Sequence, residues 1–242
     1  MKGRTMPPAM IFAAGLGTRM RPLTDDRAKA EVDLFGRPLI SHALARLRDA
    51  GVSRAAVNVH AHAERLRACL EREAAPPAIT ICDEREQLLE TGGGLKKALP
   101  ILDAPAVLTV NVDVFWVNGR EDALCRLVRH FDPVRMDGLL LIVRAAEAHG
   151  YDGRGDFEMD PMGRLDFRDP RHVSPYVFGG VALLAAAPVA AQEETVFSLS
   201  RVWRRSAAEG RLHGLLHDGL WAHIGTPLAR DETEARWPEF RS

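Results

Sequence analysis

Short apolar runs alternate with helical segments along most of this chain, and this alternation limits the fold more than any other feature. The runs lie at residues 10–14, 55–59, 79–82, 107–111 and 139–143. Apolar residues recur at helical spacing in 39–50, 61–73, 123–131, 196–209 and 228–237. Strands that alternate with helices form a mostly parallel sheet covered by helices. We therefore predict an α/β fold with a Rossmann-like, mostly parallel central sheet flanked by helices.

The pattern changes after Gly150, where turn-forming residues become frequent. They include Gly153, Gly155 and the segments 160–163 and 169–170, with alternating residues between them. This spacing predicts a small antiparallel hairpin region at the edge of the sheet, followed by a last strand over 176–184. The chain has 242 residues, 46% of them hydrophobic, which is enough to build the core of a single domain over 1–242.

Composition excludes several classes of protein. The formal net charge of −1 gives no electrostatic reason to expect binding to nucleic acid or to an anionic membrane. No segment approaches the roughly 18 apolar residues of a membrane helix. Three scattered cysteines, Cys69, Cys82 and Cys125, lack zinc-site spacing and indicate buried thiols in a reducing cytoplasm. Lys2 and Arg4 precede an apolar patch, but its shortness and two prolines argue against a secretory signal.

The segment 13–23, directly after the first predicted strand, has the composition of a phosphate-binding loop. Gly15 and Gly17 allow backbone N–H groups to approach an anion, while Arg19 and Arg21 supply permanently charged donors. The segment lacks the third glycine of a dinucleotide fingerprint and the Lys-Ser/Thr of a P-loop. A glycine-rich strand exit with solvated arginines is the alternative interpretation.

Asp113 is the strongest single candidate for a functional carboxylate. It follows the apolar run 107–111, so it lies where the carboxyl end of a central strand opens into the ligand crevice of an α/β sheet. Magnesium takes hard oxygen ligands, commonly one or two carboxylates completed by substrate phosphates. Asn111 beside it favours a binding site, whereas an aspartate that caps the following turn is the alternative.

These motifs resemble the signature of the sugar-1-phosphate nucleotidyltransferases. Residues 13–24 are similar to A-A-G-x-G-T-R-[ML]-x-P-L-T, and Lys29 matches the lysine of the P-K-P that follows, although Ala28 and Ala30 stand in place of its prolines. Similar motifs follow at 89–100, 111–113, 153–157 and 221–227. The closest branch contains N-acetylmuramate-1-phosphate uridylyltransferases and proteins labelled mannose-1-phosphate guanylyltransferase.

The resemblance implies a nucleotide-diphospho-sugar transferase type of fold and a direct transfer reaction. A sugar phosphate attacks the α-phosphorus of a nucleoside triphosphate and expels pyrophosphate, so the protein must align two polyanions and neutralise their charge. Arg19 would hold the β- and γ-phosphates, and Lys29 would contact the sugar phosphate or the α-phosphate. The nucleotide half would be about 1–135 and the sugar half about 136–242.

The resemblance also implies which residues contact the nucleotide and the sugar. The nucleotide contacts are Ala13, Ala14, Gly15, Gly17, Thr18, Glu90, Thr91, Gly92 and Gly93. The sugar contacts are Asn111 and Asp156. Two alternatives stay open: the glycines at 92–94 would also serve a helix-entry loop before Leu95, and Asp156 would also serve a turn.

The second metal ligand departs from the common pattern. Many relatives have an aspartate in the C-terminal motif where this chain has His223. Imidazole suits Mn²⁺ and other transition metals better than Mg²⁺. His223 would therefore bind a metal, hold a metal-bound water or phosphate, or have lost the role. Asp218 would face the opposite side of a continuous strand. The expected cofactor is Mg²⁺, with Mn²⁺ as the alternative, and Asp113 and His223 as ligands.

We therefore predict a cytoplasmic enzyme, a monomer or small homo-oligomer, that uses a nucleoside triphosphate and a sugar 1-phosphate. The preferred substrates are UTP and N-acetylmuramate 1-phosphate, as in cell-wall recycling. One alternative is GTP with mannose 1-phosphate. Another is a nucleotide-binding regulatory protein without turnover, which Ala28, Ala30, His223 and Glu31 would favour. Glu31 lies two residues from Lys29 and would weaken its phosphate contact by pairing with it.

Overall fold

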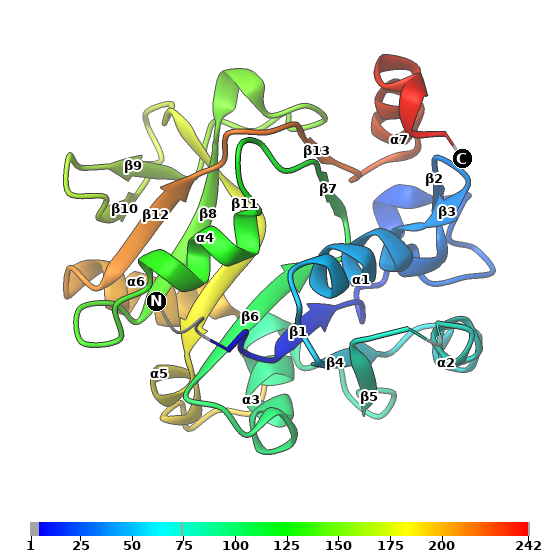
Figure 1. Cartoon of the computed structure of the whole chain (residues 1–242), viewed down its shortest axis with the longest axis horizontal. Helices are drawn as coiled ribbons and strands as arrows, with labels where there is room; N and C mark the ends of the chain where they lie inside the picture. Colours follow the sequence, from blue (N-terminus) through cyan, green and yellow to red (C-terminus); the bar gives the residue numbers. More distant parts are fainter. Residues whose placement is uncertain (1–4, 74, 242) are drawn as a thin grey trace.

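The computed structural model describes residues 5–73 and 75–241, so Lys2 and Arg4 of the signal-peptide argument lie outside the described residues. One half of the main sheet is parallel, as predicted. Its strands are β1 (Ala9–Phe12), β4 (Arg54–Val59), β5 (Ala78–Asp83) and β6 (Ala106–Asn111). They are ordered β5-β4-β1-β6, so β1 lies between β4 and β6 and runs parallel to both (Figure 1).

The other half of the sheet is mostly antiparallel. The long strand β11 (Tyr176–Ala185) pairs antiparallel with β6 and with β8 (Gly138–Arg144), and a bulge interrupts its pairing with β8 between Phe178 and Ala182. The strand β12 (Leu212–Leu216) extends the sheet beside β8 and was not predicted. The expected hairpin at the edge is formed by β9 (Phe157–Met159) and β10 (Leu165–Phe167).

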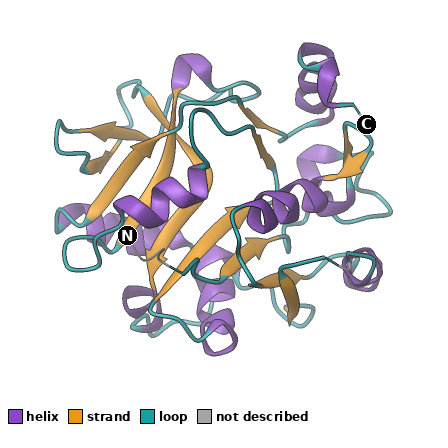
Figure 2. Ribbon diagram, in the orientation of Figure 1, coloured by secondary structure: helices purple, strands orange, loops and turns teal. Residues whose placement is uncertain are grey.

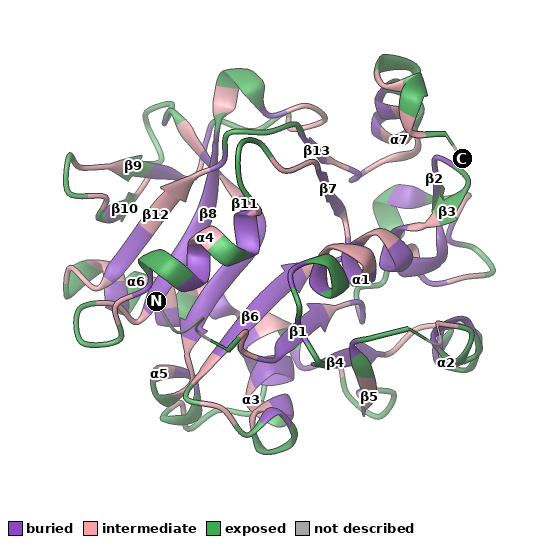
Figure 3. Cartoon of the chain, viewed as in Figure 1, coloured by how far each residue is buried: buried purple, intermediate pink, exposed green. Residues whose placement is uncertain are grey.

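Helices cover both faces of this sheet (Figures 1 and 2). One face carries α1 (Leu39–Asp49), α2 (Ala63–Glu71) and α4 (Ala123–His130); the other carries α3 (Glu90–Leu102), α5 (Ala186–Ala190) and α6 (Leu199–Ala208). Strand side chains point alternately into the two layers, so Ile11 joins the first hydrophobic core and Met10 the second. Figure 3 shows the central strands buried between these layers.

Two small β-ladders were not predicted from the sequence. The strands β2 (Asp33–Leu34) and β3 (Arg37–Pro38) form one, and β7 (Val114–Trp116) and β13 (Trp221–His223) form the other. Strands of two or three residues give no readable alternation, which explains the omission. The C-terminal helix α7 (Pro227–Arg236) returns to β2, where Glu234 accepts a hydrogen bond from the Phe35 N–H (2.7 Å).

Four short 3₁₀ helices lie in the described part of the chain, and the helix α3 begins earlier in the sequence than expected. The 3₁₀ helices are η1 (Thr18–Met20), η2 (Lys29–Glu31), η3 (Ala145–Glu147) and η4 (Pro238–Phe240). The glycines 92–94, for which a helix-entry loop was one interpretation, lie inside α3, which begins at Glu90. No helix in the described part of the chain is long and apolar enough to cross a membrane.

Candidate active site

A cavity of about 250 Å³ lies at the carboxyl ends of β1, β4 and β6. The exits of parallel strands share one edge of a sheet, so polar residues that are far apart in the sequence meet there. The cavity brings together most of the predicted site residues: Ala13, Ala14, Gly15, Lys29, Glu90, Thr91, Asn111 and Asp113. Asn58 also lines it and was not predicted.

The loop after β1 leaves the sheet in an open conformation. Gly17 has φ +63°, and a Cβ there would lie 3.0 Å from the Thr24 methyl, so the turn requires glycine. The Thr24 hydroxyl donates a hydrogen bond to the Gly17 carbonyl (2.8 Å) and closes the loop. Thr18 and Arg19 are exposed on η1 beyond this turn. The loop is therefore held at its base while its polar side chains face solvent.

A buried polar network fixes this loop to the start of α3. Asn58 Oδ1 accepts the N–H groups of Ala13 (2.7 Å) and Ala14 (3.2 Å), while its Nδ2 donates to Glu84 (2.9 Å). Glu84 also accepts the Leu89 N–H (3.1 Å) and is 1% exposed. Every hydrogen bond in the network is buried, so it is costly to break and holds its members rigidly. The polar Asn58 within the apolar strand β4 was the available sequence signal.

The glycine-rich start of α3 is packed against the segment before α6. The N–H groups of Gly92 and Gly93, which the resemblance assigns to the base, both donate to the Phe197 carbonyl (2.8 and 3.0 Å). The Thr91 hydroxyl accepts the Leu199 N–H (3.0 Å). A Cβ on Gly93 would lie 2.1 Å from the Thr195 carbonyl oxygen. The glycines therefore allow close packing, while Thr91 and Glu90 line the cavity.

Lys29 and Asp113 line the cavity, and His223 contacts Asp113 without being part of the lining. Lys29 Nζ lies 2.8 Å from Asp113 Oδ2, and His223 Nε2 lies 3.4 Å from the same oxygen. Burial acts to raise the pKa of Asp113, but the contact with His223 and the charge of Lys29 outweigh it and hold this pKa well below its usual range. Asp113 is therefore a carboxylate at neutral pH, with its side chain 24% exposed.

The ladder between β7 and β13 places His223 beside Asp113. His223 pairs with Val114, and the Ile224 N–H donates to the Asp113 carbonyl (2.8 Å). A Cβ on Gly225 would lie 2.6 Å from the His223 ring, so glycine leaves room for the imidazole. Asp218 lies before β13 and pairs with Arg126 instead (2.6 Å). One carboxylate and one imidazole thus lie together, and no group of three or more such ligands occurs among the described residues.

Asp156 lies away from this cavity's lining and is held by protein groups. It accepts hydrogen bonds from the Tyr151 hydroxyl (3.2 Å) and the Phe178 N–H (2.8 Å). Burial and the neighbouring Asp156 raise the pKa of Tyr151 to about 12. The hydroxyl therefore stays protonated and remains a hydrogen-bond donor.

Glu31 and Lys29 have separate partners, so the suggested pairing between them does not describe this structure. Glu31 is 7% exposed; it accepts the Ala28 N–H (3.1 Å) and pairs with Arg65 (3.0 Å). It closes the 3₁₀ turn that carries Lys29, which leaves the lysine free to contact Asp113. A buried structural carboxylate explains the residue that the family pattern left unexplained.

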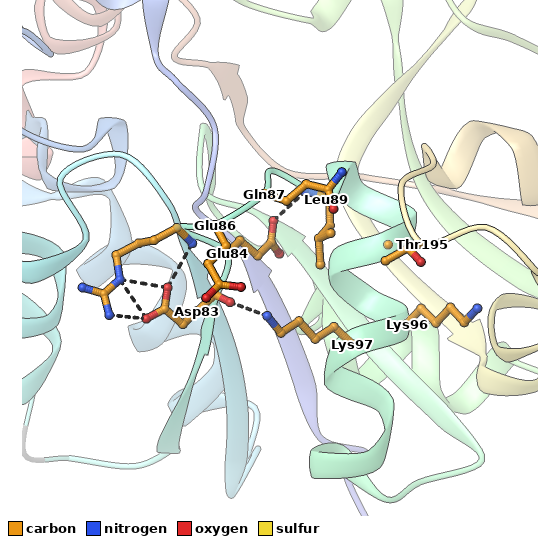
Figure 4. A pocket seen from close by; sticks show the side chains of 10 residues that line it. Asp83, Glu84, Glu86, Gln87, Leu89, Lys96, Lys97 and Thr195 are labelled. Carbon is orange, nitrogen blue, oxygen red and sulfur yellow. Dashed lines mark hydrogen bonds and ion pairs between the residues drawn. The ribbon is translucent and has the colours of Figure 1, made fainter.

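A larger cavity of about 950 Å³ lies between the exit of β5 and α3 (Figure 4). Its basic residues are already engaged: Lys97 donates to the Asp83 carbonyl, Arg85 pairs with Asp83 (2.7 Å), and Lys96 donates to the carbonyls of Gln192 and Glu194. The smaller cavity brings together most of the predicted site residues, and it is therefore the better candidate.

Comparison with known proteins gives consistent matches over nearly the whole chain. The chain is 42% identical to the N-acetylmuramate alpha-1-phosphate uridylyltransferase of Caulobacter vibrioides, with 96% of this chain and 97% of that protein covered. It is 31% identical to the protein of the same name from Neisseria meningitidis serogroup B, with 94% and 96% covered.

The fold matches a solved structure of lower identity. The inositol-1-phosphate CTP transferase from T. maritima superimposes with a TM-score of 0.78 at 15% identity, with 99% of this chain and 98% of that chain covered. At that identity the match supports the fold alone. The family model for the MobA-like NTP transferase domain matches residues 9–207, and the chain belongs to this family of nucleotidyltransferases.

Proposed function

We propose that this enzyme transfers the uridylyl group of UTP to N-acetylmuramate 1-phosphate. The observation that carries the proposal is the Lys29–Asp113–His223 cluster: Lys29 and Asp113 line the same cavity as Gly15 of the open loop, and His223 contacts Asp113. The full-length identity to two N-acetylmuramate alpha-1-phosphate uridylyltransferases supports the choice of base and sugar. GTP with mannose 1-phosphate is the alternative pair of substrates.

The residues have complementary roles in this proposal. A phosphate oxygen of the sugar attacks the α-phosphorus of UTP, the bond to the β-phosphate oxygen breaks, and pyrophosphate leaves with both electrons of that bond. Arg19 holds the β- and γ-phosphates against the N–H groups of the loop, with Gly15, Gly17 and Thr18 around them. Lys29 neutralises charge on the phosphates that change bonding. Asn111 and Asp156 orient the sugar.

We further propose that Asp113 and His223 hold a divalent metal. The donor set fits: two side chains lie within 3.4 Å of each other at the cavity, and substrate phosphates would complete the coordination. Such an ion supplies positive charge that stabilises the negatively charged phosphates. With Asp113 holding the metal, Lys29 would be available to contact a phosphate. Mg²⁺ is the expected ion, and the imidazole favours Mn²⁺ as the alternative.

Pyrophosphate release tests this proposal. The purified protein is assayed with UTP, GTP and other triphosphates against N-acetylmuramate, mannose and glucose 1-phosphates, with Mg²⁺ or Mn²⁺. We expect the highest kcat/KM with UTP and N-acetylmuramate 1-phosphate, and loss of turnover in Asp113→Asn with an unchanged circular dichroism spectrum. Triphosphate binding without pyrophosphate release under every condition would identify a regulatory nucleotide-binding protein instead.

Several wider expectations accompany the proposal. A nucleotide half of about 1–135 and a sugar half of about 136–242 remain a prediction, as do a cytoplasmic location and a role in cell-wall recycling. We expect a monomer or a small homo-oligomer without nucleic-acid or membrane partners. Gel filtration with light scattering measures the oligomeric state directly.

A further inference from the structure

Asn58 lies where the polypeptide leaves the central sheet to form the open loop. The last residue pair between β1 and β4 is Ile11 with Val57, and Asn58 follows directly on β4. The N–H groups of Ala13 and Ala14, just beyond the end of β1, both donate to Asn58 Oδ1 (2.7 and 3.2 Å). One side chain therefore accepts the first N–H groups of the loop and determines where the loop begins.

Glu84 holds the Asn58 amide in one orientation. Backbone N–H groups only donate, so the amide oxygen faces the loop and Nδ2 donates to Glu84 Oε1 (2.9 Å). Glu84 Oε2 accepts the Leu89 N–H at the start of α3 (3.1 Å). Asn58 is 3% exposed and Glu84 1% exposed. A Cβ on Gly94 would lie 2.7 Å from Glu84 Oε1, so little room remains for the pair to rearrange.

The pair places its neutral member at the candidate active site. Asn58 lines that cavity, whereas Glu84, which has the carboxyl group, lines the larger cavity instead. Hydrogen bonding alone would allow the reverse arrangement. An aspartate at position 58 would accept both loop N–H groups, and a glutamine at position 84 would donate to it and accept from Leu89. The hydrogen bonds therefore do not explain why the amide, and not the carboxylate, lies beside the cavity.

We infer that Asn58 is a positioning residue for the nucleotide and that its amide must be neutral because the triphosphate binds beside it. Asn58 holds the start of the loop in place, and Glu84 orients Asn58 while its own charge stays out of the cavity lining. A carboxylate in place of the amide would bind the loop N–H groups at least as strongly, but it would repel the phosphates. The inference rests on the proposed function, because it concerns how the same site receives UTP.

Exchanging the amide and the carboxylate separates the effect of charge from that of geometry. The double variant Asn58→Asp/Glu84→Gln can keep all four hydrogen bonds of the pair, with nearly the same side-chain shapes and the same net charge, but it moves the negative charge to the cavity. Asn58→Asp alone brings two carboxylates together, and Glu84→Gln alone puts a donor against a donor. We therefore expect the urea midpoint to fall in each single variant and to return close to the parent value in the double variant.

The binding of UTP and of uridine to the double variant then tests the inference. We expect the Kd for UTP, measured by calorimetry without a sugar phosphate, to rise about tenfold, the effect of one unit charge acting over roughly 10 Å in a partly buried site. The Kd for uridine, which has no phosphate, should stay at the parent value. Unchanged UTP binding would overturn the inference. An equal loss for UTP and uridine would also overturn it, because a displaced loop and not the charge would then be responsible.

Amide hydrogen exchange in the unmodified protein gives an independent answer. Without nucleotide, the N–H groups of Ala13 and Ala14 should exchange as slowly as those within β1, because Asn58 already holds them. Fast exchange of both in the free protein would overturn the inference even if the double variant failed to fold. If the unmodified protein binds no UTP, the proposed function fails as well; parent-like UTP binding by the double variant rejects only the inference.

Discussion

Two glycine-rich segments of this enzyme differ in the space around their glycines: one is open and the other is tightly packed. At Gly15 nothing lies within 4 Å of where a Cβ would be, and the loop around it is open to solvent. At Gly92 and Gly93 the same test gives contacts of 2.3 Å with the Phe197 ring and 2.1 Å with the Thr195 carbonyl. The first segment leaves space for a ligand, and the second allows one helix to pack against a neighbouring loop.

This contrast shows that a glycine in a family motif is not by itself evidence of a ligand contact. Both segments border the same cavity: the first does so through the glycine Gly15, and the second through Glu90 and Thr91, with Gly92 and Gly93 outside the lining. A substitution at Gly15 should change activity without changing stability. Substitutions of the packed glycines should change stability first.

Among substitutions in and around the two glycine-rich segments, the largest expected effect is that of Arg19→Ala in the open loop. Loss of one preorganised donor should lower kcat/KM about 10²–10³-fold, or about 3–4 kcal/mol. Because Arg19 is exposed, the free energy of unfolding in urea should stay within about 0.5 kcal/mol. Arg21→Ala is the control, since Arg21 makes only an exposed pair with Asp25 (3.4 Å). Equal losses in both variants would contradict a specific role for Arg19.

Gly93→Ala tests the packed segment. The added methyl would overlap the Thr195 carbonyl and force α3 away from it, so the free energy of unfolding should fall by about 3 kcal/mol. Urea unfolding followed by circular dichroism measures the change. If Gly93→Ala were as stable as the parent, the second segment would not be tightly packed and would not differ from the first in this respect.

Glu31→Gln tests the buried carboxylate that closes the 3₁₀ turn carrying Lys29. Glutamine keeps the shape but loses the charge that pairs with Arg65, so stability should fall by about 1 kcal/mol with little change in turnover. Glu64→Gln, at an exposed pair with Arg85, is the control and should be neutral. A rise in turnover in Glu31→Gln would mean that Glu31 competes for Lys29 after all.

The smallest expected change in stability is that of Gly15→Ala. The methyl has open space, so the free energy of unfolding should stay within about 0.5 kcal/mol. The KM for UTP should nevertheless rise, because the methyl occupies space intended for the triphosphate. Unchanged steady-state kinetics would show that the loop does not approach the nucleotide.

The sequence predicted the parallel half of the sheet because β1, β4, β5 and β6 are apolar runs between helices with clear periodicity. It also pointed to Asp113, because a polar residue after a buried strand lies at the ligand edge of such a sheet. Only the family resemblance placed His223 with Asp113, since their contact depends on the register of two three-residue strands more than 100 positions apart. Local periodicity carries no information about such a pairing.

The buried hydrogen-bond network around Asn58 could not be predicted from the sequence either. Asn58 interrupts an apolar strand and Glu84 follows the next one, but their hydrogen bond depends on how far β4 and β5 are offset. The separate partners of Glu31 and Lys29 depend on where α2 packs, which places Arg65 within 3.0 Å of Glu31. Both the Asn58–Glu84 hydrogen bond and the Glu31–Arg65 pair depend on tertiary packing, which local sequence patterns do not encode.

The ladder that joins β7 to β13 has a consequence for biosynthesis. The ribosome adds the loop after β1 and Asp113 long before it adds residues 221–223, which supply the His223 imidazole and pair with residues 114–116. A domain generally folds as a unit, so the native pairing of β7 has to wait for β13. The pairing partners of Val114 and the imidazole beside Asp113 are therefore added late in synthesis, and this corner of the cavity is complete only after β13 has been made.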